Sequence, residues 1–138
     1  MLLAIFFPIW VAVDNEVEKM LFPLHYTIKS GEVRNTIYFP YALCAVLAVA
    51  AATVAAMEIG KFENRLLQLK LGALNSILMA GAIGSGVYFA TRLIHANQLA
   101  GEYGLGLWLP AVAMFSNVIA NRFIRRDEKL VRDSDRLR

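Results

Sequence analysis

The sequence has few of the residues from which metal and catalytic sites are built. It contains a single cysteine, Cys44, so no disulfide can form within the chain, and only two histidines, His25 and His95. Neither histidine has a cysteine, a further histidine or a carboxylate at ligand spacing, which argues against a bound metal. No glycine-rich phosphate loop follows a strand, and no Ser, His and Asp set is placed to act together. We therefore expect no metal, no cofactor, no nucleic-acid partner and no enzymatic activity.

Charge is also scarce: charged residues make up 18% of the chain and hydrophobic residues 58%, against about 25% and 45–50% in soluble domains. Three runs carry no charge: Asn35–Met57 (23 residues), Leu71–Thr91 (21) and Tyr103–Asn121 (19). About 20 apolar residues suffice to cross a bilayer as a helix. The first of these runs lacks the polar stripe of a soluble bundle helix. We predict membrane spans at approximately 36–57, 71–91 and 103–121.

A fourth apolar run, Met1–Val13, has only 13 residues. Nothing basic precedes it and Val11-Ala12-Val13 is a poor cleavage site, so a cleaved signal peptide is not indicated. A partial or tilted helix would explain the run. We favour the second half of a spanning helix that begins upstream of Met1. With this partial span at 1–13, the chain becomes a single integral membrane domain, 1–138, with four spans.

The basic residues are distributed unequally between the connecting segments. The 60–70 loop and the tail 122–138 together hold ten Lys and Arg, and the 14–34 and 92–102 segments hold four. Basic flanks remain cytoplasmic, so both termini are expected to be cytoplasmic. In the outer 14–34 segment and just beyond it, β-branched and aromatic residues flank Lys29-Ser30-Gly31-Glu32, which favours a small β-hairpin. The expected fold is an all-α membrane protein: a four-helix transmembrane bundle with a truncated first helix, a small outer hairpin and a cytoplasmic amphipathic C-terminal helix.

Small residues recur every four positions within the expected spans, as close helix packing in lipid requires. They are expected either to pack the bundle or to dock another protein; they are Gly72, Ser76, Ala80 and Gly84, with Ala48 and Ala52. Asn75, Ser76, Asn117 and Asn121 are expected to form hydrogen bonds between helices. Glu58, at the end of its run, is interpreted as a boundary residue that reaches water or pairs with Lys61.

The tail from Arg122 combines an apolar stripe with charges of both signs. The bases nearest the membrane suit an anchor to anionic lipid, but the interleaved acids oppose that attraction. Two interpretations remain: an anchor alone, or an anchor that also docks a protein. The candidate docking residues are Arg122, Asp127, Glu128, Arg132, Asp135 and Arg136.

The tail NRFIRRDEKLVRDSDRLR, preceded by YGLGLWLP, resembles the C-terminal signature of a bacterial membrane family known as domain of unknown function 4293. The stretch GKFENRLLQLKLGALN is similar to that family's inner loop. The resemblance implies four spans in a bacterial inner membrane and no assigned activity. It matches the following positions without giving them a role: Asn121, Arg122, Asp127, Glu128, Leu130, Val131, Asp135, Arg136 and Arg138. Relatives usually begin with a short basic stretch that this sequence lacks.

Together these patterns favour a non-enzymatic accessory or structural subunit of a larger membrane complex. Its expected partners are the lipid bilayer and a membrane protein that binds the cytoplasmic tail. Two alternatives are a component of a small-solute transporter or channel, and a lipid-modifying membrane enzyme. The first would need a polar path through the spans and the second a cluster of Asp, Glu or His at one interface.

Overall fold

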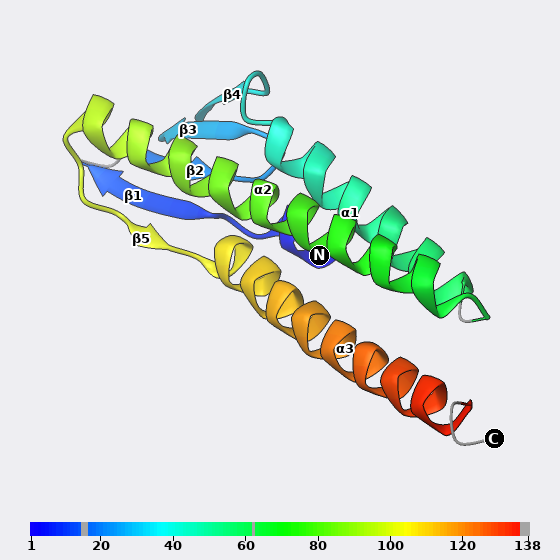
Figure 1. Ribbon diagram of the computed structural model, residues 1–138. Helices are drawn as coiled ribbons and strands as arrows, with labels where there is room; N and C mark the ends of the chain where they lie inside the picture. Colours follow the sequence, from blue (N-terminus) through cyan, green and yellow to red (C-terminus); the bar gives the residue numbers. More distant parts are fainter. Residues whose placement is uncertain (15–16, 62, 136–138) are drawn as a thin grey trace.

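The computed structural model describes residues 1–14, 17–61 and 63–135, with three long helices and a β-sheet at one end of them (Figure 1). In chain order the elements are a 3-10 helix η1 (Leu2–Phe6), β1 (Trp10–Asp14), β2 (Val17–Leu21), β3 (Tyr26–Ser30), β4 (Val33–Ile37), α1 (Leu43–Gly60), α2 (Arg65–Asn97), β5 (Glu102–Tyr103) and α3 (Leu105–Asp135). The helices α1 and α2 are antiparallel neighbours, and α3 runs along the other side of α2 (Figure 1).

The sheet has five strands in the order β4-β3-β2-β1-β5, and every pair in it is antiparallel. The hairpin expected around Lys29–Glu32 is present as β3 and β4, with Ser30 opposite Val33. Its two-residue loop is Gly31-Glu32, and Gly31 has a φ of +57°, a conformation that glycine adopts without steric cost. This hairpin forms one edge of the five-stranded sheet.

The expectation of an all-α, four-helix bundle with a truncated first helix is wrong. The run Met1–Val13 divides at Pro8 into η1 and β1. Within β1, Trp10 and Ala12 are buried while Val13 is exposed, which is the alternation of a strand with one covered face. Strand β1 pairs with β2 on one side and with β5, from a distant part of the sequence, on the other. The run is therefore the centre of a sheet and not a partial span.

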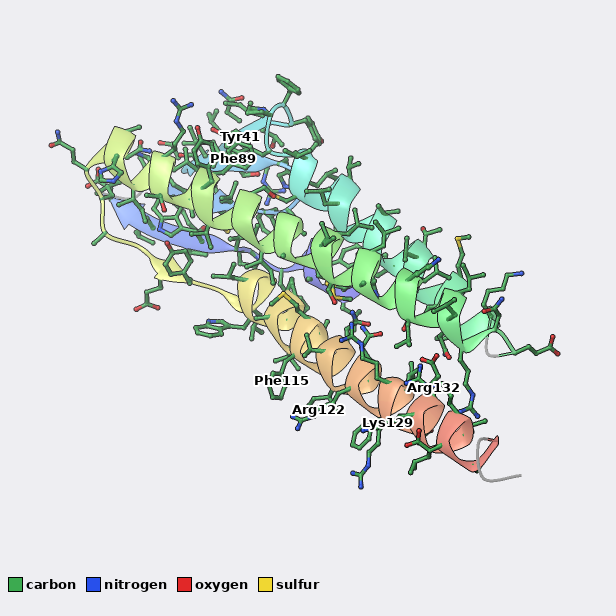
Figure 2. The ribbon with its side chains drawn as sticks, viewed as in Figure 1. Tyr41, Phe89, Phe115, Arg122, Lys129 and Arg132 are labelled. Carbon is green, nitrogen blue, oxygen red and sulfur yellow. The ribbon has the colours of Figure 1, made fainter. Side chains whose placement is uncertain are left out.

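Helix α2 is the element on which the rest of the molecule packs. Its 33 residues reach about 50 Å at 1.5 Å per residue, well beyond the ~30 Å hydrocarbon core of a bilayer. Part of the excess lies at the sheet end, where Phe89, Ala90 and Leu93 join Trp10 and Leu21 in one buried cluster. Tyr41 meets Phe89 edge to face with ring centroids 5.3 Å apart; both residues are labelled in Figure 2.

Helices α1 and α3 pack against different parts of the length of α2. The 18 residues of α1 reach about 27 Å, and the Ser85 hydroxyl donates to the Cys44 Sγ across the α1–α2 contact at 3.3 Å. Between α1 and α3 lies η1, which contacts both and buries Ala4. The 31 residues of α3 extend past the α1–α2 loop at the end opposite the sheet (Figure 1).

Candidate functional site: the α2–α3 contact and the end of α3

A polar layer joins α2 to α3 within their apolar stretches. The Nδ2 of Asn117 donates to the Gly72 carbonyl at 3.0 Å and to the Ser76 Oγ at 2.9 Å. The Ser76 hydroxyl in turn donates to the same carbonyl at 3.0 Å. The side-chain amide of Asn121 lies directly against the Cα of Gly72, where a Cβ would overlap it. Because lipid supplies few competing partners, such bonds hold neighbouring spans together.

Two amide oxygens in this region have no hydrogen-bond partner among the described residues: the Oδ1 atoms of Asn75 and Asn121. The side chain of Asn75 is only 1% exposed. Buried polar atoms are nearly always satisfied by protein, water or a ligand. The polar layer therefore has hydrogen-bonding capacity left over after the contacts between α2 and α3 are made.

Next to this layer is a groove of about 440 Å³ between α2 and α3. We call it the α2–α3 groove; its lining residues are Ala73, Ser76, Ile77, Val118, Asn121, Arg122 and Arg125. A smaller polar pocket of about 180 Å³ follows toward the end of α3 and is lined by Arg65, Gln68, Ile124 and Asp127. The wall of the α2–α3 groove is thus apolar on one side and basic at one end.

Of the six candidate docking residues, the four whose side chains the structure describes do not form one cluster. Arg122 borders the α2–α3 groove and Asp127 lines the smaller pocket. Glu128 and Arg132 lie on the part of α3 beyond the groove. Arg136 and the side chain of Asp135 lie outside the part of the chain that the structure describes. Figure 2 shows Arg122 and Lys129 extending from one side of α3 and Arg132 from another.

The far part of α3 also carries an apolar face that no described element covers. Phe123 and Leu130, one heptad apart, are 60% and 61% exposed. Residues seven apart lie on nearly the same side of a helix, and this side is opposite the one that Asn117 and Asn121 present to α2. The sequence pattern had shown the stripe, but only the packing of α2 shows that the stripe points outward.

The six small residues expected to pack helices also differ in their environments. Gly72 and Ser76 lie in the α2–α3 contact, and Ala48 is buried on α1. Ala52 is half-buried, whereas Ala80 and Gly84 are exposed. A spacing of four residues advances by 400°, so each step drifts about 40° around a helix of 3.6 residues per turn. The buried row on α2 instead alternates spacings of three and four, through Gly72, Asn75, Met79, Ala82, Gly86 and Phe89.

Glu58 is one residue whose setting the sequence pattern missed. The sequence predicts a boundary residue that reaches water or pairs with Lys61, but Glu58 is 7% exposed, on the buried face of α1 with Cys44, Ala48 and Ala51. Its position seven residues after Ala51 was the available signal. Within the described ranges, no group of three or more His, Cys, Asp or Glu is placed to hold a metal ion.

These features define a class of protein: a helical protein with three helices long and apolar enough to cross a membrane and a β-sheet packed on the overhanging end of one of them. Residues 1–137 match the family described as a domain of unknown function (DUF4293), and the chain belongs to this family. No curated protein and no solved structure matches the chain.

Proposed function

We propose that this protein is a multi-pass subunit of a bacterial inner-membrane assembly and that it binds a protein partner through the end of α3. The observation that carries the proposal is the exposed apolar face of Phe123 and Leu130. Leu130 is eight residues beyond Arg122, or about 12 Å along the helix. It therefore lies beyond the uncharged part of α3, where lipid tails would not cover it.

Charges of both signs flank this face and favour a protein over a lipid surface. Anionic lipid attracts bases and repels acids, yet Asp127, Glu128 and Asp133 alternate here with Arg126 and Arg132. A helix with an apolar stripe between mixed charges suits a groove on another protein that has complementary charges along its rim.

The distribution of basic residues supports the orientation in the membrane that we propose. The α1–α2 loop and the far part of α3 lie at the same end of the molecule (Figure 1), and they carry most of the Lys and Arg. By the positive-inside rule this end is cytoplasmic. Three crossings then put the sheet on the outer side, so the sheet and the end of α3 face different compartments.

The experiment compares wild type with Leu130→Glu, using a tag inserted in the exposed Gly31-Glu32 turn so that η1 and α3 stay unmodified. After mild solubilisation, wild type should retain a partner in near-equal amount, and Leu130→Glu should lose it by about tenfold or more, as expected for an apolar anchor at the centre of an interface. Lys129→Gln, a neighbouring exposed position, is the matched control and should retain the partner. A photo-crosslinker at Leu130 should then attach to that same partner.

The opposite result would also be clear. If wild type, Leu130→Glu and Lys129→Gln all purify as the same species in several mild detergents, and the crosslinker at Leu130 captures only lipid, then the end of α3 is an anchor and the docking proposal is wrong.

A further inference from the structure

The α2–α3 groove combines an apolar wall with two bases at its mouth. Ala73, Ile77 and Val118 form much of the wall, and Arg122 and Arg125 lie at one end of it. The volume of about 440 Å³ is within the range of about 300–1,000 Å³ that small-molecule sites usually occupy. A ligand that fits this groove needs an apolar part and an anionic part.

The two arginines are free to receive an anion. They lie three residues apart and so share one flank of α3. Among the described residues the structure has one ion pair, between Lys29 and Glu18, so no described carboxylate neutralises either arginine. Arg122 is among the residues that line the groove, and Figure 2 shows its side chain extending outward from α3.

The position of the groove along the membrane normal indicates which kind of anion is available to bind there. Arg122 is the first charged residue after the uncharged run Tyr103–Asn121, and Lys70 ends the corresponding run on α2. The arginines therefore lie at the level of lipid headgroups, and Ala73 and Ile77 lie one to two turns deeper, at the level of acyl chains. Basic pockets between spanning helices at this level bind anionic headgroups.

Asn121 adds a polar feature to the same wall. It lines the groove, and its Oδ1 is buried without a hydrogen-bond partner among the described residues. An amide oxygen accepts hydrogen bonds. This oxygen lies against the Cα of Gly72, so Asn121 gives the groove a polar wall but is not needed as a ligand of the lipid headgroup.

We propose that the α2–α3 groove binds one anionic glycerophospholipid. Its phosphodiester lies between Arg122 and Arg125, and one acyl chain runs along Ala73, Ile77 and Val118. This requires α3 to cross the membrane with Arg122 at the boundary, but it does not require a protein partner at Leu130. The lipid site and the docking face can therefore fail separately.

The test is native mass spectrometry of the full-length protein in detergent, titrated with phosphatidylglycerol and, separately, with phosphatidylcholine. Wild type should bind one phosphatidylglycerol in preference to phosphatidylcholine. The double variant R122Q/R125Q should lose about fivefold or more in affinity for phosphatidylglycerol, since each base near a headgroup contributes appreciably. The matched control R126Q/K129Q removes the same charge at the same spacing from positions that do not line the groove, and should stay within about twofold of wild type.

Two substitutions to phenylalanine distinguish binding in the groove from general electrostatic attraction of lipid to α3. Ala73→Phe fills the apolar part and leaves both arginines, so it should also weaken phosphatidylglycerol binding. Leu74→Phe, one residue along at another exposed position, should have no effect. Before titration, each variant is compared with wild type by circular dichroism and gel filtration. Lipid affinities are compared only for variants whose helix content and elution volume equal those of wild type.

Three outcomes would overturn the proposal. Equal losses in R122Q/R125Q and R126Q/K129Q would mean that any base on α3 suffices. Equal binding of phosphatidylcholine and phosphatidylglycerol would mean that no anion is recognised. Displacement of phosphatidylglycerol by millimolar inorganic phosphate or glycerol phosphate, with no effect of Ala73→Phe, would mean that the arginines bind a soluble anion instead.

Discussion

Gly72 is the point of closest approach between α2 and α3. The Asn121 amide occupies the space that a Cβ would need, and the Gly72 carbonyl accepts from both Asn117 and Ser76. Gly84 belongs to the same row in the sequence, but no atom lies within 4 Å of its ideal Cβ. Gly72 and Gly84 thus lie in different surroundings on one helix, so the same substitution at each compares a packed position with an open one.

We predict that Gly72→Leu forces α2 and α3 apart and destabilises the folded protein by about 1–3 kcal/mol, the usual cost of overfilling a packed contact. Gly84→Leu should change the stability by less than about 0.5 kcal/mol, as a substitution into open space does. Thermal unfolding in detergent measures both. Equal destabilisation by the two variants would contradict the contact described at Gly72.

His25, in the β2–β3 loop, is the titratable group near neutral pH whose surroundings matter most. It stacks on Phe22 with ring centroids 4.9 Å apart and lies 5.6 Å from the Tyr38 ring. Burial, and then the positive charge of Arg34, lowers the pKa of His25 below its ordinary value of 6.5. The folded loop therefore favours the neutral imidazole.

We predict that the sheet end loses stability as the pH falls below about 6.5. In that window the unfolded chain binds more protons at His25 than the folded chain, so the free energy of unfolding decreases with decreasing pH until the folded histidine is protonated as well. Hydrogen exchange of β2 and β3 amides between pH 7.5 and 5 measures the change. His25→Phe keeps an aromatic ring on Phe22 and should remove most of this pH dependence; an unchanged profile would assign it to another group.

At the scale of elements, the helices are offset from one another along a common direction. Helix α2 overhangs at the sheet end and α3 overhangs at the opposite end (Figure 1). The overhang of α2 is stabilised by burying Phe89 and Leu93 under the sheet, whereas Phe123 and Leu130, in the half of α3 that leads to its overhang, face away from α2 and are exposed. The overhang of α2 has its partner within the chain, and the exposed face of Phe123 and Leu130 on α3 is the one for which we propose an external partner.

We predict that Leu93→Ala weakens the packing of the sheet on α2 by about 2–4 kcal/mol, because the substitution leaves a cavity in a buried cluster. The matched control is Leu74→Ala on the same helix, where the side chain is already 45% exposed; it should cost less than about 1 kcal/mol. Faster amide exchange in β1 and β2 for Leu93→Ala alone would support this. Equal exchange in both variants would show that the sheet does not depend on α2.

At the scale of the whole molecule, three helices long and apolar enough to cross a membrane separate two exposed regions. The sheet lies at one end of the helices and the last turns of α3 lie at the other (Figure 1). The three candidate spans lie between them. The three crossings that we propose would place a partner at the sheet and a partner at the end of α3 in different compartments.

We predict that Val33→Cys and Ser134→Cys, each in a Cys44→Ala background, react with an impermeant thiol reagent from opposite sides of the membrane. Both positions are exposed in the structure. In intact spheroplasts, only Val33→Cys should be labelled, and Ser134→Cys should react after permeabilisation. Labelling of both from the outside would contradict an odd number of crossings, and labelling of Ser134→Cys alone would reverse the orientation.

Much of the helical part could be predicted from the sequence. Runs without charge, such as Leu71–Thr91, are long enough to cross a membrane. Each of the three contains a helix, although residues 36–42 of the expected span 36–57 lie in β4 and the loop after it. The hydrogen bond between Asn117 and Ser76 is of the kind expected for polar groups within spans. The β3–β4 hairpin was also predictable, because the turn Gly31-Glu32 and the alternating flanks are local features.

The rest depended on contacts between distant residues. Composition alone cannot distinguish a buried strand such as β1 from part of an apolar helix, because both are continuous apolar runs. Strand β1 is a strand because β2 and β5 hydrogen-bond to it and α2 covers its Trp10 face. In the same way, the apolar and basic residues of the α2–α3 groove are separated in the sequence, and only the packing of α3 on α2 through Gly72 brings them together.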